Sequence, residues 1–158
     1  VTKVAVVQAK TIFEAGECYK AYKQLGYEKI AFSYGASYYN DICPHVNTYL
    51  GKALGRVQVL TTLFSTGIIQ DTDRVHLLGC AVPQEFGFYN GFNFIESIDT
   101  SNPVMAGLEG TIYGEHGLFK KPKLAIDATM NFTKDDLGGS LIDKIFFNTK
   151  KFRTINNI

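Results

Sequence analysis

The sequence predicts an α/β fold with a parallel sheet. Short apolar runs alternate with segments of helical spacing, and a polar residue or a glycine stands at the end of each apolar run. Four such strand and helix units follow one another within residues 1–110. Because strict alternation implies right-handed crossovers, the strands are expected to lie parallel in one sheet.

The amino-terminal part of the chain is predicted to form a strand, a helix and a second strand. Residues 3–8 form a continuous apolar run of the kind found in a strand buried on both faces. Thr11 and Glu14 have the spacing of a capping box, which predicts the start of a helix, and Gly26 predicts its end. A second strand is expected over residues 29–33.

The remaining units continue the alternation. Residues 46–64 are expected to form a helix, although two glycines interrupt its pattern. Residues 74–79 form the third predicted strand, residues 83–88 a short helix and residues 94–98 the fourth strand.

The tail, residues 111–158, is expected to be a C-terminal extension of a single domain that spans residues 1–158. Asp135 and Asp136 stand near the start of a predicted helix, residues 138–152, which ends in a basic run. Acidic residues at the amino end and basic residues at the carboxyl end match the helix dipole.

Composition restricts the class of protein. The 158 residues, 46% hydrophobic and 20% charged, suffice for one domain with a core. A net charge of +1 means that a nucleic acid would have to be held by a local basic patch.

Cys18, Cys43 and Cys80 form neither a disulfide framework nor a CxxC zinc pattern. No apolar run approaches the ~20 residues of a membrane span. We therefore expect a soluble cytoplasmic protein without a metal or cofactor.

The strand ends are the expected place for chemistry, because working side chains in parallel β/α folds project from the carboxyl ends of strands. A glutamine amide can read the edge of a planar heterocycle, and a carboxylate can attack or hold a developing cation. Glycines allow a ring to lie against the backbone. The four predicted strand ends carry Gln8, then Ser33 with Gly35, then Gly79 with Cys80, and finally Asp99.

The segments around these ends also match a known family in order and spacing over about the first 105 residues. They are Val6-Val-Gln8-Ala, Lys29-Ile-Ala-Phe-Ser-Tyr-Gly35, His76-Leu-Leu-Gly-Cys-Ala-Val-Pro83 and Ile98-Asp99 through Pro103. They resemble the second half of the tRNA-guanine transglycosylase barrel. The resemblance implies that residues 1–110 are four βα units, half of a TIM-type (β/α)8 barrel.

The resemblance also implies roles for the strand-end residues. Asp99 would attack C1′ of a nucleotide, expel guanine and form a covalent ribosyl ester, as a retaining glycosidase does. Gln8 would read the purine edge, and the target base would leave its stack to reach the pocket. The implied base pocket is lined by Ala31, Phe32, Ser33, Gly35, Leu78 and Gly79.

The chain departs from the family pattern at several points. Ala9 and Lys10 replace two glycines, and Ala31 replaces a pocket glycine. Val104 and Met105 stand where the family has a threonine and a phosphate-positioning arginine. The cysteines and histidine of the family's zinc site are absent. These departures favour a relative that inserts 7-deazaguanine bases into phage or bacterial DNA over ordinary queuosine-type exchange in tRNA.

The family's general base lies in the first half of the barrel, which this chain does not contain. The chain begins at Val1 without a methionine, which suggests a trimmed product or a piece of a longer protein. The expected function is therefore pentosyl transfer, the exchange of guanine for a 7-deazaguanine base in tRNA or DNA. It would require a missing N-terminal half or a homo-oligomer.

Other interpretations stay open. The chain could be a non-catalytic barrel subunit or a nucleobase-binding fragment, or an unrelated small α/β domain whose strand ends mimic the pattern. Asp99 could be a helix N-cap or turn residue, and His76 a packing residue of the core. Cys80 is expected to be a small buried residue.

Two groups of side chains could contact nucleic acid. Lys120, Lys121 and Lys123 form either a solvated loop or a phosphate contact. Tyrosines beside a strand end are candidates for base stacking, and they are Tyr34, Tyr38 and Tyr39.

Overall fold

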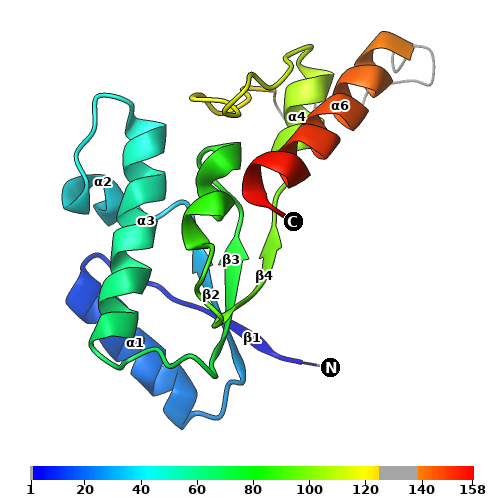
Figure 1. Ribbon diagram of the computed structural model, residues 1–158. Coiled ribbons are helices and arrows are strands. Elements are labelled where there is room, and N and C mark those ends of the chain that lie inside the picture. Colours follow the sequence, from blue (N-terminus) through cyan, green and yellow to red (C-terminus); the bar gives the residue numbers. More distant parts are fainter. Residues whose placement is uncertain (1, 125–138) are drawn as a thin grey trace.

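The computed structural model describes residues 2–124 and 139–158 (Figure 1). Its centre is a sheet of four strands in the order β1-β2-β3-β4, in which every neighbouring pair is parallel. The predicted α/β class with a parallel sheet is therefore confirmed. The strands are β1 (Val4–Val6), β2 (Lys29–Ser33), β3 (Arg74–Leu78) and β4 (Ile95–Asp99).

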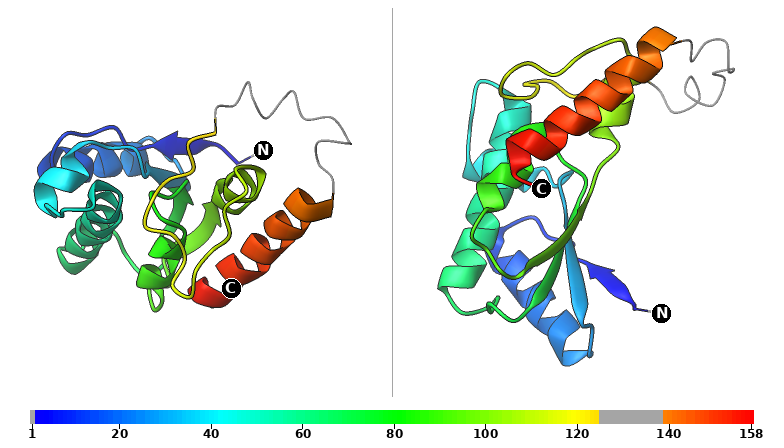
Figure 2. Two further views of the ribbon diagram at one scale, coloured as in Figure 1. Left: turned by 90° about the horizontal axis from the view of Figure 1, so that it is seen from above. Right: turned by 45° about the vertical axis from the view of Figure 1, so that its right-hand side comes forward.

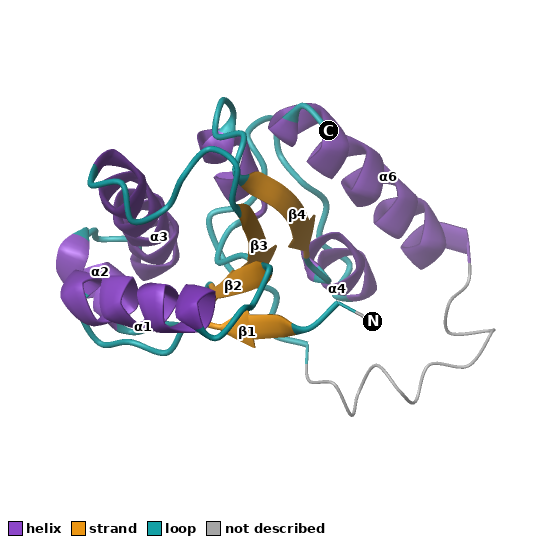
Figure 3. Ribbon diagram, turned by 90° about the horizontal axis from the view of Figure 1, so that it is seen from below, coloured by secondary structure: helices purple, strands orange, loops and turns teal. Residues whose placement is uncertain are grey.

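The helices surround this sheet unevenly. Helices α1 and α3 cover one face, while α4 and α6 lie side by side beyond the carboxyl end of β4 (Figures 1 and 3). Among the described residues, no helix is both long and apolar enough to cross a membrane. The helical elements are α1 (Ile12–Gln24), α2 (Tyr38–Ile42), α3 (Thr48–Ser65), the 3-10 helix η1 (Pro83–Tyr89), α4 (Asn102–Leu108) and α6 (Gly139–Asn156).

The predicted start of α1 is confirmed, with one change in the capping pattern. Thr11 Oγ1 accepts the backbone N–H of Glu14 at 3.1 Å, as an N-cap does. The Glu14 carboxylate, however, accepts the N–H of Lys10 rather than that of Thr11. Gly26, just after the helix, has a φ of 79°.

Three predicted elements differ in detail. The first strand is shorter than residues 3–8, and the segment over 83–88 is a 3-10 helix rather than an α-helix. The tail helix extends to Asn156, whereas Asp135 and Asp136 lie outside the described residues. The short helices α2 and α4 were not predicted.

The glycines in α3 do not break the helix, because one of them allows a close approach. A Cβ on Gly55 would lie 2.1 Å from the carbonyl oxygen of Tyr39 in α2. Only glycine therefore allows α2 and α3 to pack this tightly. Tyr39 itself is buried in the core.

The two faces of the sheet differ in chemistry. One face packs against α1 and α3 through buried apolar side chains, which supply the hydrophobic core. On the other face the register aligns Ala31 with His76 and His76 with Ser97. This open face carries polar side chains, and we call the set Lys29, His76, Ser97 and Asp99 the polar face.

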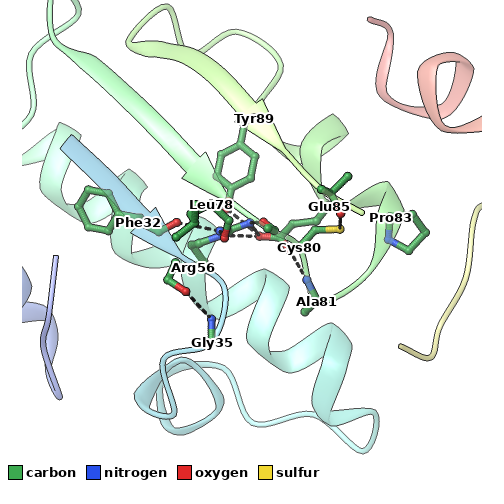
Figure 4. Close-up of polar contacts among 12 residues, drawn as sticks. Phe32, Gly35, Arg56, Leu78, Cys80, Ala81, Pro83, Glu85 and Tyr89 are labelled. Atoms are coloured by element: carbon green, nitrogen blue, oxygen red, sulfur yellow. Dashed lines mark hydrogen bonds and ion pairs between the residues drawn. The ribbon is translucent and has the colours of Figure 1, made fainter. Parts of the chain in front are cut away.

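A buried ion pair joins Arg56 of α3 to Glu85 of η1 (Figure 4). Arg56 and Glu85 are both 0% exposed, and Arg56 Nε donates to Glu85 Oε1 at 2.7 Å. The same guanidinium donates to the carbonyls of Phe32, Leu78 and Gly79 at 2.9, 3.3 and 2.8 Å. Burial alone would lower the pKa of Arg56, but the Glu85 carboxylate raises it above its ordinary value. The guanidinium therefore stays charged and fully bonded.

The Arg56→Met variant should lose about 3–5 kcal/mol of the free energy of unfolding, because it leaves Glu85 buried and unpaired. Urea denaturation measures the loss. Arg74→Met is the matched control, since Arg74 forms an exposed ion pair with Glu96 and its removal should destabilise the protein far less. Equal losses in the two variants would show that the buried pair has no special role.

Candidate active site

The structure brings the ends of β2, β3 and β4 together. The register aligns Ser33 with Leu78 and Leu78 with Asp99. Beyond these residues lies an open hollow of about 530 Å³, within the usual size range of small-molecule sites. We call it the aspartate hollow, and it is lined by Ser33, Tyr34, Leu78, Gly79, Asp99, Thr100 and Ser101.

Asp99 is the reactive group that this hollow presents. Its side chain is 56% exposed, and its Oδ1 accepts the backbone N–H of Gly79 at 2.7 Å. Its Oδ2 lies 3.8 Å from His76 Nε2. One carboxylate oxygen is thus fixed by a charge-assisted hydrogen bond, and the other faces the open face of the sheet. A held and accessible carboxylate can act as a nucleophile or stabilise a cation.

The alternative role of Asp99 as a helix cap is not what the structure shows. Asp99 is the last residue of β4, and Ser101 occupies the N-cap position of α4. The local turn is instead held by Thr100, whose Oγ1 accepts the N–H of Asn102 at 3.1 Å. The carboxylate of Asp99 is left to bind Gly79.

His76 lies beside this carboxylate rather than in the core. Its Nδ1 forms a hydrogen bond with Ser97 Oγ at 2.9 Å, and Lys29 Nζ donates to the same oxygen at 3.3 Å. The polar face is therefore a connected chain from Lys29 through Ser97 and His76 toward Asp99. His76 is half-buried and hydrogen-bonded, and it does not belong to the buried core. The alternation of inward and outward residues along β3 was the signal that could have found it.

Gly79 is required by both its backbone and its neighbour. Its φ is +66°, and a Cβ on it would lie 2.5 Å from the ring of Tyr34. Tyr34 is held over this glycine because its backbone N–H donates to the Leu78 carbonyl at 3.0 Å. The glycine at the end of β3 therefore admits the Tyr34 ring against the backbone.

Four of the predicted binding residues do not line the aspartate hollow. Ala31 and Phe32 are each 1% exposed, and the carbonyl of Phe32 is already bonded to Arg56. Gln8 is exposed beyond the end of β1. Gly35 is exposed on the loop after β2, where its N–H donates to Ser33 Oγ at 3.2 Å.

Two other expectations at the strand ends are resolved by burial. Tyr38 and Tyr39 are buried in the core, so among the three candidate stacking tyrosines only Tyr34 reaches the hollow. Cys80 is also buried, and burial raises the pKa of its thiol to about 12. At neutral pH Cys80 is therefore a protonated, weakly nucleophilic side chain, as expected of a small buried residue.

Comparison with known proteins gave no match to a family model, a curated protein or a solved structure. Within residues 2–124 and 139–158, no three side chains of His, Cys, Asp or Glu lie close enough together to hold a metal ion. The candidate site is therefore defined by Asp99 and the groups that orient it.

Gly79→Ala should destabilise the protein more than Gly67→Ala. Both glycines have a positive φ, but nothing lies within 4 Å of a Cβ on Gly67. The control variant Gly67→Ala should therefore lose only about 1–2 kcal/mol of the free energy of unfolding, which is the cost of backbone strain. Gly79→Ala should lose more, because its Cβ also collides with the ring of Tyr34. Urea denaturation compares the two, and Tyr34→Ala should relieve the excess in the double variant. Equal costs for the two glycines would contradict the close contact.

Proposed function

We propose that this chain is the C-terminal half of a TIM-type barrel of a transglycosylase-like enzyme, which exchanges guanine for a 7-deazaguanine base in tRNA or DNA. The observation that carries the proposal is Asp99, an exposed carboxylate at a strand end, oriented by the Gly79 N–H in an open hollow of about 530 Å³. The resemblance of the strand-end segments supports it independently.

The reaction would proceed through two displacements at C1′. Asp99 Oδ2 attacks C1′ as the glycosidic bond breaks, and guanine departs with the bonding electrons and takes up a proton. The incoming 7-deazaguanine then gives up a proton and attacks C1′ of the aspartyl ester, which restores the carboxylate. Two inversions retain the configuration of the sugar. The hydrogen bond from Gly79 fixes Oδ1 and so orients Oδ2 for the attack.

The topology supports the half-barrel interpretation. In a doubly wound sheet the strand order reverses at a switch point, so that strands are added on both sides of the first strand. In a barrel the strands lie side by side in the order in which they occur in the sequence. The order here is β1-β2-β3-β4, which leaves β1 and β4 as the edges of the described sheet. Four further parallel strands would pair both edges and close the barrel.

The polar face supports the same interpretation. Side chains such as Lys29 and His76 would line the interior of a closed barrel, where the partly buried network around Ser97 remains satisfied. An N-terminal segment would also supply the general base that the resemblance implies, whereas a second copy of this chain would close the sheet without it.

A non-catalytic role is the second candidate, and the position of Gln8 favours it. The residue expected to read the purine edge is exposed outside the aspartate hollow. A barrel subunit that binds a nucleobase or nucleic acid without chemistry would not need that contact. It would keep its affinity for nucleic acid when Asp99 is replaced.

Covalent trapping tests the proposal. The protein, joined to any N-terminal half, is incubated with labelled tRNA or labelled duplex DNA and a non-exchangeable guanine analogue, then run on a denaturing gel. A slowly migrating adduct should form with the wild type and should fall at least about a thousand-fold in Asp99→Asn, because the nucleophile is lost. The polymer that carries the label identifies the substrate.

Asp71→Asn is the control for this experiment. Asp71 is exposed before β3 and bonds only to Asn93 among the described residues, so its adduct yield should equal that of the wild type. An adduct that persists in Asp99→Asn contradicts the assignment of the nucleophile. No adduct with either polymer, while binding is intact, supports the non-catalytic role.

A further inference from the structure

A second hollow adjoins the aspartate hollow. It has a volume of about 330 Å³, and the two hollows share Tyr34, Gly79, Thr100 and Ser101. Its outer wall comes from residues 121–124, which belong to a segment that crosses above the carboxyl ends of the strands (Figure 2, left). We call it the lysine hollow, because Lys121 and Lys123 both line it.

Lys121 is held in this wall by one aromatic side chain. Its Nζ donates a hydrogen bond to the hydroxyl of Tyr34 and lies 4.7 Å from the centre of the same ring. The Tyr34 ring in turn packs on Gly79, whose N–H binds Asp99. The ammonium group is therefore positioned relative to the carboxylate through three successive contacts, from Lys121 to Tyr34, from Tyr34 to Gly79 and from Gly79 to Asp99.

The charge of Lys121 has no carboxylate partner within the described residues. None of the ion pairs formed there includes Lys120, Lys121 or Lys123. The nearby acidic residue Glu109 is engaged by the backbone N–H of Lys123 at 2.9 Å. A partly buried ammonium beside an open hollow is stabilised when an anion enters that hollow.

We propose that Lys121 binds the backbone phosphate next to the nucleotide whose C1′ meets Asp99. This inference rests on the proposed function, and it makes the substrate a nucleotide within a polymer rather than a free nucleoside. A sugar in the aspartate hollow would place its phosphate in an adjoining space, and the lysine hollow is an adjoining space that carries positive charge. Lys121 is a positioning residue, since it fixes the sugar relative to Oδ2.

The test compares the affinities of the wild type and of Lys121→Ala for short single-stranded oligonucleotides that contain one guanine, made as DNA and as RNA. Each is compared with a version in which the linkages on both sides of that guanosine are neutral methylphosphonates. The wild type should bind the neutral version about ten-fold more weakly, because a charged hydrogen bond is lost. Lys121→Ala should bind the normal oligonucleotide about ten-fold more weakly and should not distinguish the two versions.

Salt dependence and controls complete the test. The slope of log affinity against log salt should fall by about 0.7 in Lys121→Ala, which corresponds to one phosphate contact on a single strand. Lys121→Arg should restore both the affinity and the discrimination. Lys20→Ala removes an exposed lysine of α1 and should behave as the wild type. If Lys121→Ala still discriminates as strongly as the wild type on both DNA and RNA, the inference is wrong.

The result of this binding test is independent of the result of covalent trapping, because binding requires no covalent step. A trapped adduct with no coupling between Lys121 and the phosphate overturns this inference alone. Coupling without any adduct leaves the phosphate site in place and overturns the transglycosylase chemistry.

Discussion

The buried guanidinium of Arg56 is the constraint on which the arrangement of the strand ends depends. It binds the carbonyl at the end of β2, the last carbonyl of β3 and the carbonyl of Gly79. Glu85 neutralises it and accepts the N–H of Ala81, which fixes the start of η1 as well. A buried pair of this kind adds little net stability, but breaking it is costly. Its effect is to hold backbone groups from separate segments in a single geometry.

Gly79 connects the hydrogen bonds of Arg56 to the candidate active site. Its carbonyl is bound by Arg56, and its N–H is bound by the carboxylate of Asp99. Its positive φ and missing side chain let the ring of Tyr34 settle on it, and Tyr34 in turn holds Lys121. A carboxylate and an ammonium group, both linked to one glycine, therefore line two adjoining hollows. The carboxylate is held by the Gly79 backbone N–H, and the ammonium group is held by the Tyr34 side chain that packs on the same glycine.

The sequence predicted the periodic elements well, because alternation of apolar runs and helical segments is a local signal. It did not identify Arg56, whose partner Glu85 lies 29 residues away and has no local pattern to link the two. Lys121 was predicted only as one of several loop lysines, since its place depends on the path of the chain above the strands. That path brings it to the hollow that Met105 lines, where the family resemblance would expect an arginine. Both residues line one hollow although they lie apart in the chain, so no local pattern in the sequence predicts their proximity.

The most direct test of the account is to locate the covalent bond. The adduct trapped with labelled nucleic acid is digested, and the peptide that retains the nucleotide remnant is fragmented by mass spectrometry. The account predicts a sugar-phosphate remnant esterified to Asp99. A remnant on another carboxylate, such as Glu109, would contradict it.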